Sequence, residues 1–286
     1  MNIFYIGSSG ALSLIPFKRL LAGGFNIVAV GIYNPVRLDS KIIALENESL
    51  ALAANQANIP VVDLSRPVTG IVKHCAGLSI DVTLMSCYAK RLPDEVIQLA
   101  GKGCYNMHPS LLPAYRGPEP VFWQMKYASD IGVSWHQVDS DFDAGDIVAQ
   151  KKVFPDDGLT HAEISMQLAE NGSMLMLEML SDISTGCLHK VRQDSEHSSY
   201  YPYPDRSDFV IDTAYDAQQV YNFMCATQAF GYAYRYQCGR HLLYLTSAVD
   251  YDNNRTLDTV EVHADKLYIP CNGGVLIATY TDKIPA

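Results

Sequence analysis

The 286-residue sequence has little of what marks several large classes of protein. Its seven cysteines are scattered and include no Cys-x-x-Cys pair, which argues against a zinc ribbon or a disulfide framework and favours a reducing compartment. No window of about 20 residues is uniformly apolar, so no transmembrane helix or other membrane contact is expected. Lys+Arg number 21 against 31 Asp+Glu, a net charge of −10 that disfavours general nucleic-acid binding. These absences predict a cytoplasmic protein.

The residues that are present predict an α/β fold. Hydrophobic residues make up 48% of the chain, enough for one large or two modest cores. The first half alternates strand-like and helix-like segments, a pattern typical of a parallel sheet with helices on both faces. The strand-like segments are 2–6, 26–33, 80–85 and 104–107, and the helical ones 11–21, 46–57 and 93–100. We therefore predict a Rossmann-like, mostly parallel sheet.

The second half predicts a smaller domain of different composition. Segments 132–138 and 146–153 read as two further strands, and Thr160 with Glu163 forms a capping-box pattern that opens a long helix. Residues 193–208 are rich in Tyr, Pro and Ser and predict a connector. Short strand-like runs separated by turns follow it. We predict a catalytic domain at 1–192, a connector at 193–208 and a small antiparallel β domain, an OB-like barrel or a sandwich, at 209–286.

Three polar residues form the pattern with the clearest chemistry. Asn106 and His108 lie two apart at the carboxyl end of a predicted strand, so their side chains share one face at the edge where open α/β sheets bind ligands. Asp143 lies in a turn before a later strand. An amide and an imidazole can donate to a developing oxyanion, while a carboxylate orients the imidazole and handles a proton. This set predicts acyl transfer to an amine without a Ser or Cys nucleophile.

The motifs around these residues resemble a known family. They are Asn106-x-His108, Ser110-Leu111-Leu112-Pro113, Arg116-Gly117 and Asp143-x-Gly145. The sequence resembles the formyltransferases that use 10-formyltetrahydrofolate, which include methionyl-tRNA and sugar N-formyltransferases. The resemblance implies the formyltransferase fold and a reaction that needs no metal. It also implies that Asn106, His108 and Asp143 are the catalytic residues.

The resemblance also implies a folate site. In the family, the loop after the strand that precedes the catalytic Asn covers the pterin, and the loop before the catalytic Asp lines the same pocket. The matching residues here are Lys90, Arg91, Leu92, Ile97, Val138, Asp139, Asp141 and Phe142.

Residues that would bind the acceptor are more open. Ser8, Ser9 and Gly10 follow the first strand, where N–H groups could hold an acceptor phosphate or merely form a tight turn. Arg116, with Ser110 and Gly117 beside it, could bind an acceptor anion or could order the loop.

The identity of the acceptor is predicted from the departures from the family. Longer relatives often carry an Arg where this chain has Cys225, and no basic insertion follows the first strands. With the net charge of −10, this favours a small or nucleotide-linked amine, above all an amino sugar nucleotide, over tRNA, which stays open. Two other functions stay open as well, a 10-formyltetrahydrofolate hydrolase and a protein that binds folate without turnover. A homodimer is also compatible with the sequence.

Overall fold

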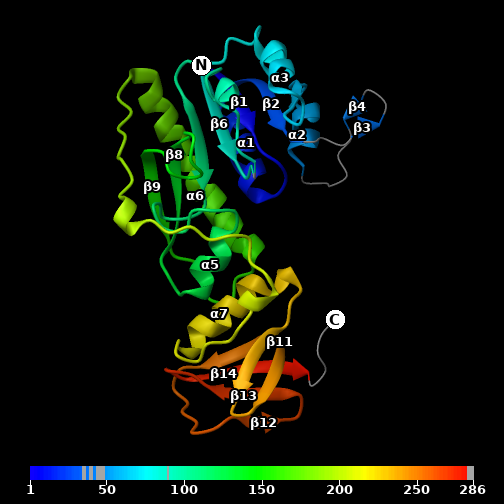
Figure 1. The fold of residues 1–286 in the computed structure, drawn as a ribbon, viewed down its shortest axis with the longest axis vertical. Helices are drawn as coiled ribbons and strands as arrows, with labels where there is room; N and C mark the ends of the chain where they lie inside the picture. The colour runs from blue at the N-terminus through cyan, green and yellow to red at the C-terminus, as the bar shows by residue number, and fades with distance from the viewer. Residues whose placement is uncertain (34–36, 39–40, 43–48, 89, 282–286) are drawn as a thin grey trace. The chain divides into compact units, whose positions relative to one another are not determined.

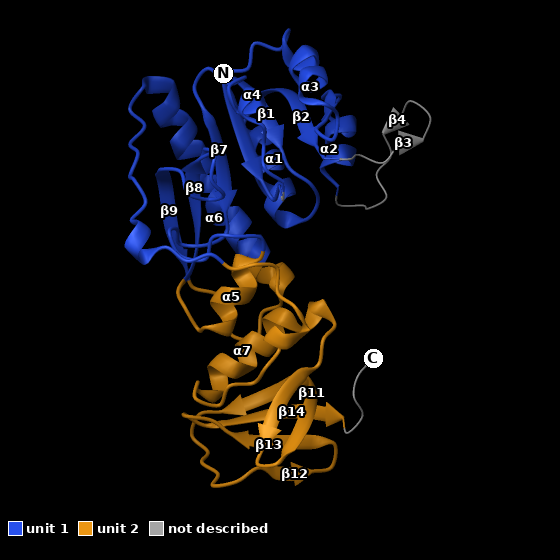
Figure 2. Cartoon of the chain, in the orientation of Figure 1, with its two compact units in different colours: residues 1–118, 131–153, 165–200 blue, residues 119–130, 154–164, 201–286 orange. Residues whose placement is uncertain are grey.

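The structure is a computed structural model that describes residues 1–33, 37–38, 41–42, 49–88 and 90–281. The chain divides into two compact units. Figure 1 shows the fold coloured by position along the chain, and Figure 2 colours the two units separately. The first unit comprises residues 1–118, 131–153 and 165–200, and the second comprises 119–130, 154–164 and 201–286. Both units are therefore built from separate stretches of the sequence.

A seven-stranded sheet forms the centre of the first unit. In order across the sheet, the strands are β5 (Val61–Asp63), β2 (Asn26–Ile32), β1 (Asn2–Ile6), β6 (Val82–Ser86), β7 (Cys104–His108), β8 (Ile131–Gln137) and β9 (Ile147–Val153). The first five pair in parallel, and β8 and β9 are added antiparallel. A separate two-stranded pair joins β3 (Arg37–Leu38) to β4 (Lys41–Ile42). The predicted mostly parallel, Rossmann-like sheet is confirmed.

Helices cover both faces of this sheet, because successive side chains of a strand point to opposite sides. Phe4 belongs to a buried cluster that includes residues of α3 and α4. Its neighbour Tyr5 points the other way, where its ring lies 5.6 Å from that of Phe17 in α1. On β8, the Trp135 Nε1–H donates to the Gly172 carbonyl of α6 at 2.7 Å. The helices are α1 (Ala11–Ala22), α2 (Leu50–Gln56), α3 (Val68–Cys75), α4 (Asp94–Ile97) and α6 (His161–Thr185).

The second unit contains a five-stranded antiparallel sheet. Its strands, in order, are β10 (Tyr234–Cys238), β11 (His241–Asp252), β14 (Val275–Thr281), β13 (Lys266–Pro270) and β12 (Glu261–His263). Helix α7 (Ala217–Thr227) packs on β11 and β14, and α5 (Pro120–Lys126) packs on α7. Short 3₁₀ turns are η1 (Ser195–His197), η2 (Arg206–Asp208) and η3 (Gln228–Phe230). The predicted small antiparallel domain is confirmed, and its strands form one sheet backed by a helix.

Most predicted elements are found within a few residues of their expected places. The capping box holds, since the Glu163 carboxylate accepts from the Thr160 N–H at 2.8 Å. The predicted helix over 46–57 corresponds to α2, and its residues 46–48 lie outside the described residues. The predicted helix over 93–100 is shorter, because α4 ends at Ile97. The domain boundaries at 192 and 209 stay a prediction. Within the described part of the chain, no helix is both long and apolar enough to cross a membrane.

Candidate active site

Strand β7 carries Asn106 and His108 to the carboxyl edge of the sheet. Both side chains are on the face that Cys104 shares with α3 and α4, because they alternate with Met107 along the strand. Asn106 is 9% exposed and His108 4% exposed. Buried polar groups need hydrogen-bond partners, so the surroundings of these two side chains decide their protonation and orientation.

Asp143 reaches this edge from the turn between β8 and β9. Its backbone is left-handed at φ 53°, and a Cβ on Gly145 would lie 1.9 Å from the Gln137 carbonyl oxygen, so this tight turn requires glycine there. The Asp143 Oδ2 accepts the Gly117 N–H at 3.0 Å. Its Oδ1 lies 3.6 Å from the His108 Nδ1. The structure thus brings together all three residues that the sequence singled out, although His108 and Asp143 stand slightly beyond hydrogen-bond distance.

A fourth residue, His136, belongs to the same cluster. It stands directly opposite Asn106 in the antiparallel pairing of β7 and β8. The Asn106 amide lies 3.1 Å from the His136 Nε2, and that nitrogen lies 3.5 Å from the Asp143 Oδ1. His136 is not among the residues that the sequence singled out. The alternation of β8 could have pointed to it, but only with the register against β7 already known.

Hydrogen-bond partners assign the protons on both imidazoles. The His108 Nε2 lies 2.8 Å from the Tyr115 carbonyl oxygen, which only accepts, so this nitrogen donates. The His136 Nδ1 likewise faces the carbonyl oxygen of Gln137 at 2.9 Å. Neutral His108 therefore presents the lone pair of Nδ1 toward Asp143, and neutral His136 presents that of Nε2 to the Asn106 amide.

Burial and charge set the ionisation of His108 and Asp143. Burial is the largest influence on His108 and lowers its pKa below the usual histidine value, although Asp143 and the Tyr115 carbonyl act to raise it. Burial raises the pKa of Asp143, but the imidazoles of His108 and His136 and the Gly117 N–H outweigh it. The pKa of Asp143 consequently lies well below its usual value. A neutral imidazole beside an ionised carboxylate is an arrangement that can accept a proton.

A narrow hollow of about 40 Å³ adjoins Asn106, His136 and Asp143. Its other lining residues are Met85, Tyr88, Lys90, Arg91, Leu92, Val138, Asp139, Ser140, Asp141 and Phe142. Among the predicted folate residues, all but Ile97 therefore line one space. Ile97 instead packs against the buried cluster of the first unit.

The predicted acceptor residues lie in other surroundings. Ser8, Ser9 and Gly10 form the turn from β1 to α1, where the Ser8 hydroxyl donates to the Cys87 carbonyl at 2.9 Å. Ser110 is fully buried, and its hydroxyl donates to the Ala114 carbonyl at 2.7 Å. Neither the 8–10 turn nor Ser110 lines the hollow, and their roles in binding stay predictions.

Arg116 and Gly117 are engaged with the protein itself. The Arg116 guanidinium donates through Nε and Nη2 to the Gln193 Oε1, at 3.1 and 2.7 Å. Gly117 donates its N–H to Asp143. These contacts favour the loop-ordering reading of Arg116 over anion binding.

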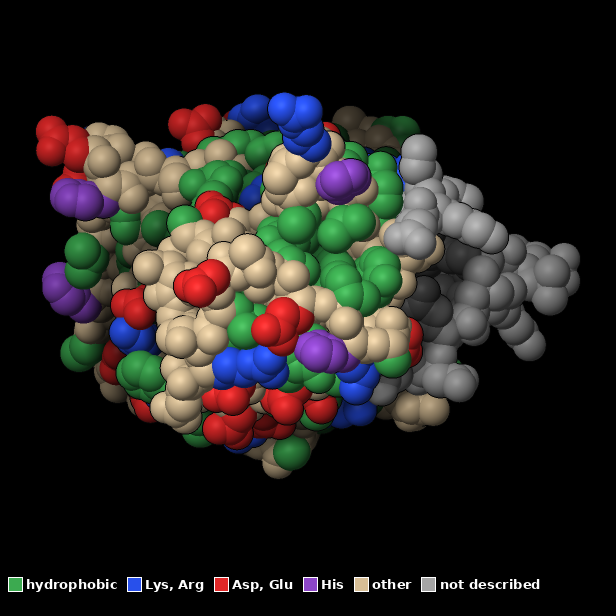
Figure 3. All heavy atoms as spheres, turned by 90° about the horizontal axis from the view of Figure 1, so that it is seen from below, with side chains coloured by type: hydrophobic (Ala, Val, Ile, Leu, Met, Phe, Trp, Pro, Cys, Tyr) green, Lys and Arg blue, Asp and Glu red, His purple; other side chains and the backbone are tan. Residues whose placement is uncertain are grey.

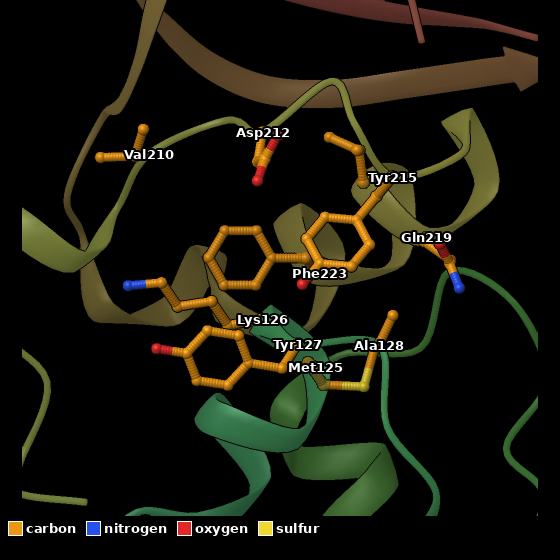
Figure 4. A pocket seen from close by; sticks show the side chains of 10 residues that line it. Met125, Lys126, Tyr127, Ala128, Val210, Asp212, Tyr215, Gln219 and Phe223 are labelled. Carbon is orange, nitrogen blue, oxygen red and sulfur yellow. The ribbon is translucent and has the colours of Figure 1, made fainter. Parts of the chain in front are cut away.

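A larger hollow of about 180 Å³ lies in the second unit. Figure 4 shows the rings of Tyr127, Tyr215 and Phe223 around it, with Lys126 and Asp212 at its border. Its lining contains none of the predicted site residues. Among the described residues, no group of three or more His, Cys, Asp or Glu side chains is placed to hold a metal ion. The smaller hollow beside Asn106 is the candidate active site, because Asp143, whose pKa is strongly shifted, lines it and lies 3.6 Å from His108.

Comparison of the sequence with known proteins finds a matching family model and several relatives. A sequence model of the family described as formyl transferase matches residues 63–180, a span that contains Asn106, His108, His136 and Asp143. A methionyl-tRNA formyltransferase of Acetivibrio thermocellus is 30% identical over 225 residues, which are 77% of this chain and 72% of the relative. One of Desulfotalea psychrophila is 27% identical over 281 residues, or 98% of this chain and 84% of the relative.

A solved structure shares the fold over nearly the whole chain. It is an N-formyltransferase of Helicobacter canadensis in complex with folinic acid and dTDP-3-aminofucose. It matches 98% of this chain and 99% of its own, with a TM-score of 0.69 and 18% sequence identity. On the strength of the family match and the sequence relatives, the chain belongs to the formyl transferase family.

Proposed function

We propose that this protein transfers a formyl group from 10-formyltetrahydrofolate to the amine of a nucleotide-linked amino sugar. The observation that carries the proposal is the buried meeting of Asn106, His108 and Asp143 beside the hollow at the carboxyl edge of β7. The folate supplies the formyl group. The residues of the chain orient the reactants, stabilise charge and move a proton.

Asn106 is the group that would stabilise the oxygen of the formyl group. Its Nδ2 has two protons, one directed to His136 at 3.1 Å and one to Asp143 at 3.5 Å. The second contact is long and weak, so an oxygen that gains negative charge as the amine adds to the formyl carbon can accept that proton in place of Asp143. His136 would hold the rest of the amide in place.

His108 and Asp143 would handle the proton of the amine. A proton taken at the His108 Nδ1 lies between the ring and the Asp143 carboxylate, while the Tyr115 carbonyl holds the opposite nitrogen. As the new C–N bond forms, the bond from the formyl carbon to the donor nitrogen breaks. The proton lost by the amine then passes from His108 to that departing nitrogen.

The lining of the hollow fits a pterin. Its apolar side chains, Met85, Leu92 and Val138, suit the faces of a flat bicyclic ring. Lys90 and Arg91 suit the carboxylates of a glutamate tail.

Charge supports a small anionic acceptor over a tRNA. The net charge is −10, and on the face shown in Figure 3 the described basic side chains stand among acidic ones without forming a continuous basic surface. A tRNA is held largely through its phosphates, which such a surface repels. The structural neighbour that carries dTDP-3-aminofucose supports the same choice.

We propose that this protein is located in the cytoplasm, because all seven of its cysteines are free thiols.

Methionyl-tRNA is the second candidate acceptor. The observation in its favour is that the sequence relatives compared above are methionyl-tRNA formyltransferases. The two candidates separate cleanly in one assay, in which purified protein and 10-formyltetrahydrofolate are mixed with either amino sugar nucleotides or charged initiator tRNA. Tetrahydrofolate formation is followed in each mixture.

We expect turnover with an amino sugar nucleotide and none with the tRNA. Asn106→Ala should lower turnover by roughly 10²- to 10³-fold, because it removes one oxyanion donor. Asn254→Ala, at an exposed position, is the matched control and should not change it. Turnover with the tRNA alone would replace our acceptor with the second candidate. Formate release without any acceptor would make the protein a hydrolase.

A further inference from the structure

Gln193 has an unusually complete set of hydrogen bonds close to the candidate active site. It follows α6, is 9% exposed, and lies outside the three residues that the sequence singled out. Its Nε2 donates to the carbonyl oxygens of Asp143 and Gly145, at 2.8 and 2.7 Å. Its Oε1 accepts hydrogen bonds from the Nε and Nη2 of Arg116. Two carbonyls on one side and a guanidinium on the other leave only one possible orientation of this amide.

These bonds join the two backbone segments that hold the His108–Asp143 pair. The segment around Arg116 supplies the Tyr115 carbonyl to His108 and the Gly117 N–H to the Asp143 carboxylate. The other segment carries Asp143 itself. Gln193 is thus bonded to both segments at once.

Both segments contain a residue in a conformation that does not persist without support. Tyr115 has φ 58° and Asp143 has φ 53°, in the left-handed region that side chains other than glycine seldom adopt. Such residues are held by their surroundings and cluster at functional sites. Ser199 adds to the support, since its Oγ accepts the Tyr115 N–H at 2.9 Å.

We propose that Gln193 is a positioning residue, which holds the Asp143 carboxylate at its place beside His108 by joining the 115–117 and 143–145 segments. This inference rests on the proposed formyl transfer for its catalytic consequence. Its structural part, that Gln193 sets the position of Asp143 relative to His108, does not depend on the proposed function. It also assigns Arg116 a role, as the second half of the same connection.

The central test is Gln193→Met, which keeps the length of the side chain and removes all four hydrogen bonds. We expect kcat to fall by roughly 10²-fold, as misplacement of a catalytic group by about 1 Å does. The KM value for the folate should change little, because Gln193 does not line the hollow. Gln237→Met is the matched control, since Gln237 is exposed and its Nε2 donates to the Gly239 carbonyl at 2.9 Å. The control should leave kcat unchanged.

A second readout does not depend on activity. The pKa of His108 can be followed by NMR of its ring protons, assigned with His108→Gln. Burial lowers this pKa, Asp143 and the Tyr115 carbonyl raise it, and His136 and Arg116 lower it by smaller amounts. If Gln193→Met displaces Asp143, the pKa of His108 falls. A residue that only stabilised the fold would leave it unchanged. This measurement stands even if no acceptor is turned over, so failure of the proposed function and failure of this inference can be told apart.

Gln193→Glu is the second variant, needed if Gln193→Met does not fold. A carboxylate still pairs with Arg116 but cannot donate to the two carbonyls, so the connection to the 143–145 segment is lost. We expect it to fold and to show the same loss of kcat. Wild-type kcat in whichever of the two variants folds would overturn the inference, and so would an unchanged His108 pKa in folded Gln193→Met.

Discussion

At the scale of single residues, the pH dependence of the reaction follows from His108. Burial brings its pKa below the usual value of 6.5 despite the charge of Asp143. Only the neutral ring can accept a proton at Nδ1. We expect kcat/KM to rise with pH through a limb with an apparent pKa below 6.5, and then to stay level through neutrality.

Asp143→Asn tests the assignment of that limb. The carboxylate raises the pKa of His108, so its removal should move the limb to lower pH, and kcat should fall by roughly 10²- to 10⁴-fold. A limb at or above pH 6.5 in the wild type would contradict the assignment.

The depressed pKa of His108 also makes the unfolded chain bind more protons than the folded one. The stability that neutral His108 contributes is therefore present above its unfolded pKa and is lost as the pH falls through the folded value.

At the scale of elements, the turn between β8 and β9 depends on one glycine. A Cβ at position 145 would lie 1.9 Å from the Gln137 carbonyl oxygen, and this contact is to backbone, which has no free side chain to move aside. Gly145→Ala should therefore push the turn away from β7, costing about 1–3 kcal/mol of stability and most of the activity.

Chemical denaturation and turnover of Gly145→Ala would measure both effects. Gly77→Ala is the matched control, because a Cβ there meets nothing within 4 Å. Equal stability of the two variants would show that the turn can shift without cost. Loss of activity with retained stability would instead place the whole effect on Asp143.

The elements also show how far the sequence leads. Hydrophobic periodicity predicted β1, β6 and β7, because buried parallel strands are nearly continuous apolar runs. It missed β5, which has only three residues, and α3, whose cap position holds Pro67 without a side-chain hydrogen bond. Local patterns also do not state which strands pair, so the antiparallel register that sets His136 against Asn106 could not be predicted. The contacts of Gln193 were hidden for the same reason, since about 50 residues separate it from Asp143.

At the scale of the whole molecule, the two units are interleaved along the chain. The second unit includes residues 119–130 and 154–164 in addition to 201–286. Phe122, from the first of these stretches, is fully buried, and its ring lies 5.2 Å from Phe209, 5.6 Å from Phe223 and 5.5 Å from Phe230. The core of this unit is thus completed by a residue far upstream of the predicted boundary at 209.

This arrangement predicts that the second unit loses much of its stability without Phe122. Phe122→Ala should destabilise it by about 3–5 kcal/mol, the usual cost of emptying a buried aromatic site. We expect thermal unfolding and protease cleavage within 201–286 at lower temperature than in the wild type, whereas Val262→Ala, at a position 57% exposed, should behave as wild type. A fragment of residues 209–286 lacks the Phe122 ring altogether and should unfold without a cooperative transition. If that fragment unfolds cooperatively at the wild-type temperature, residues 209–286 form a complete core without Phe122. The predicted boundary at 209 would then mark the start of an independent domain.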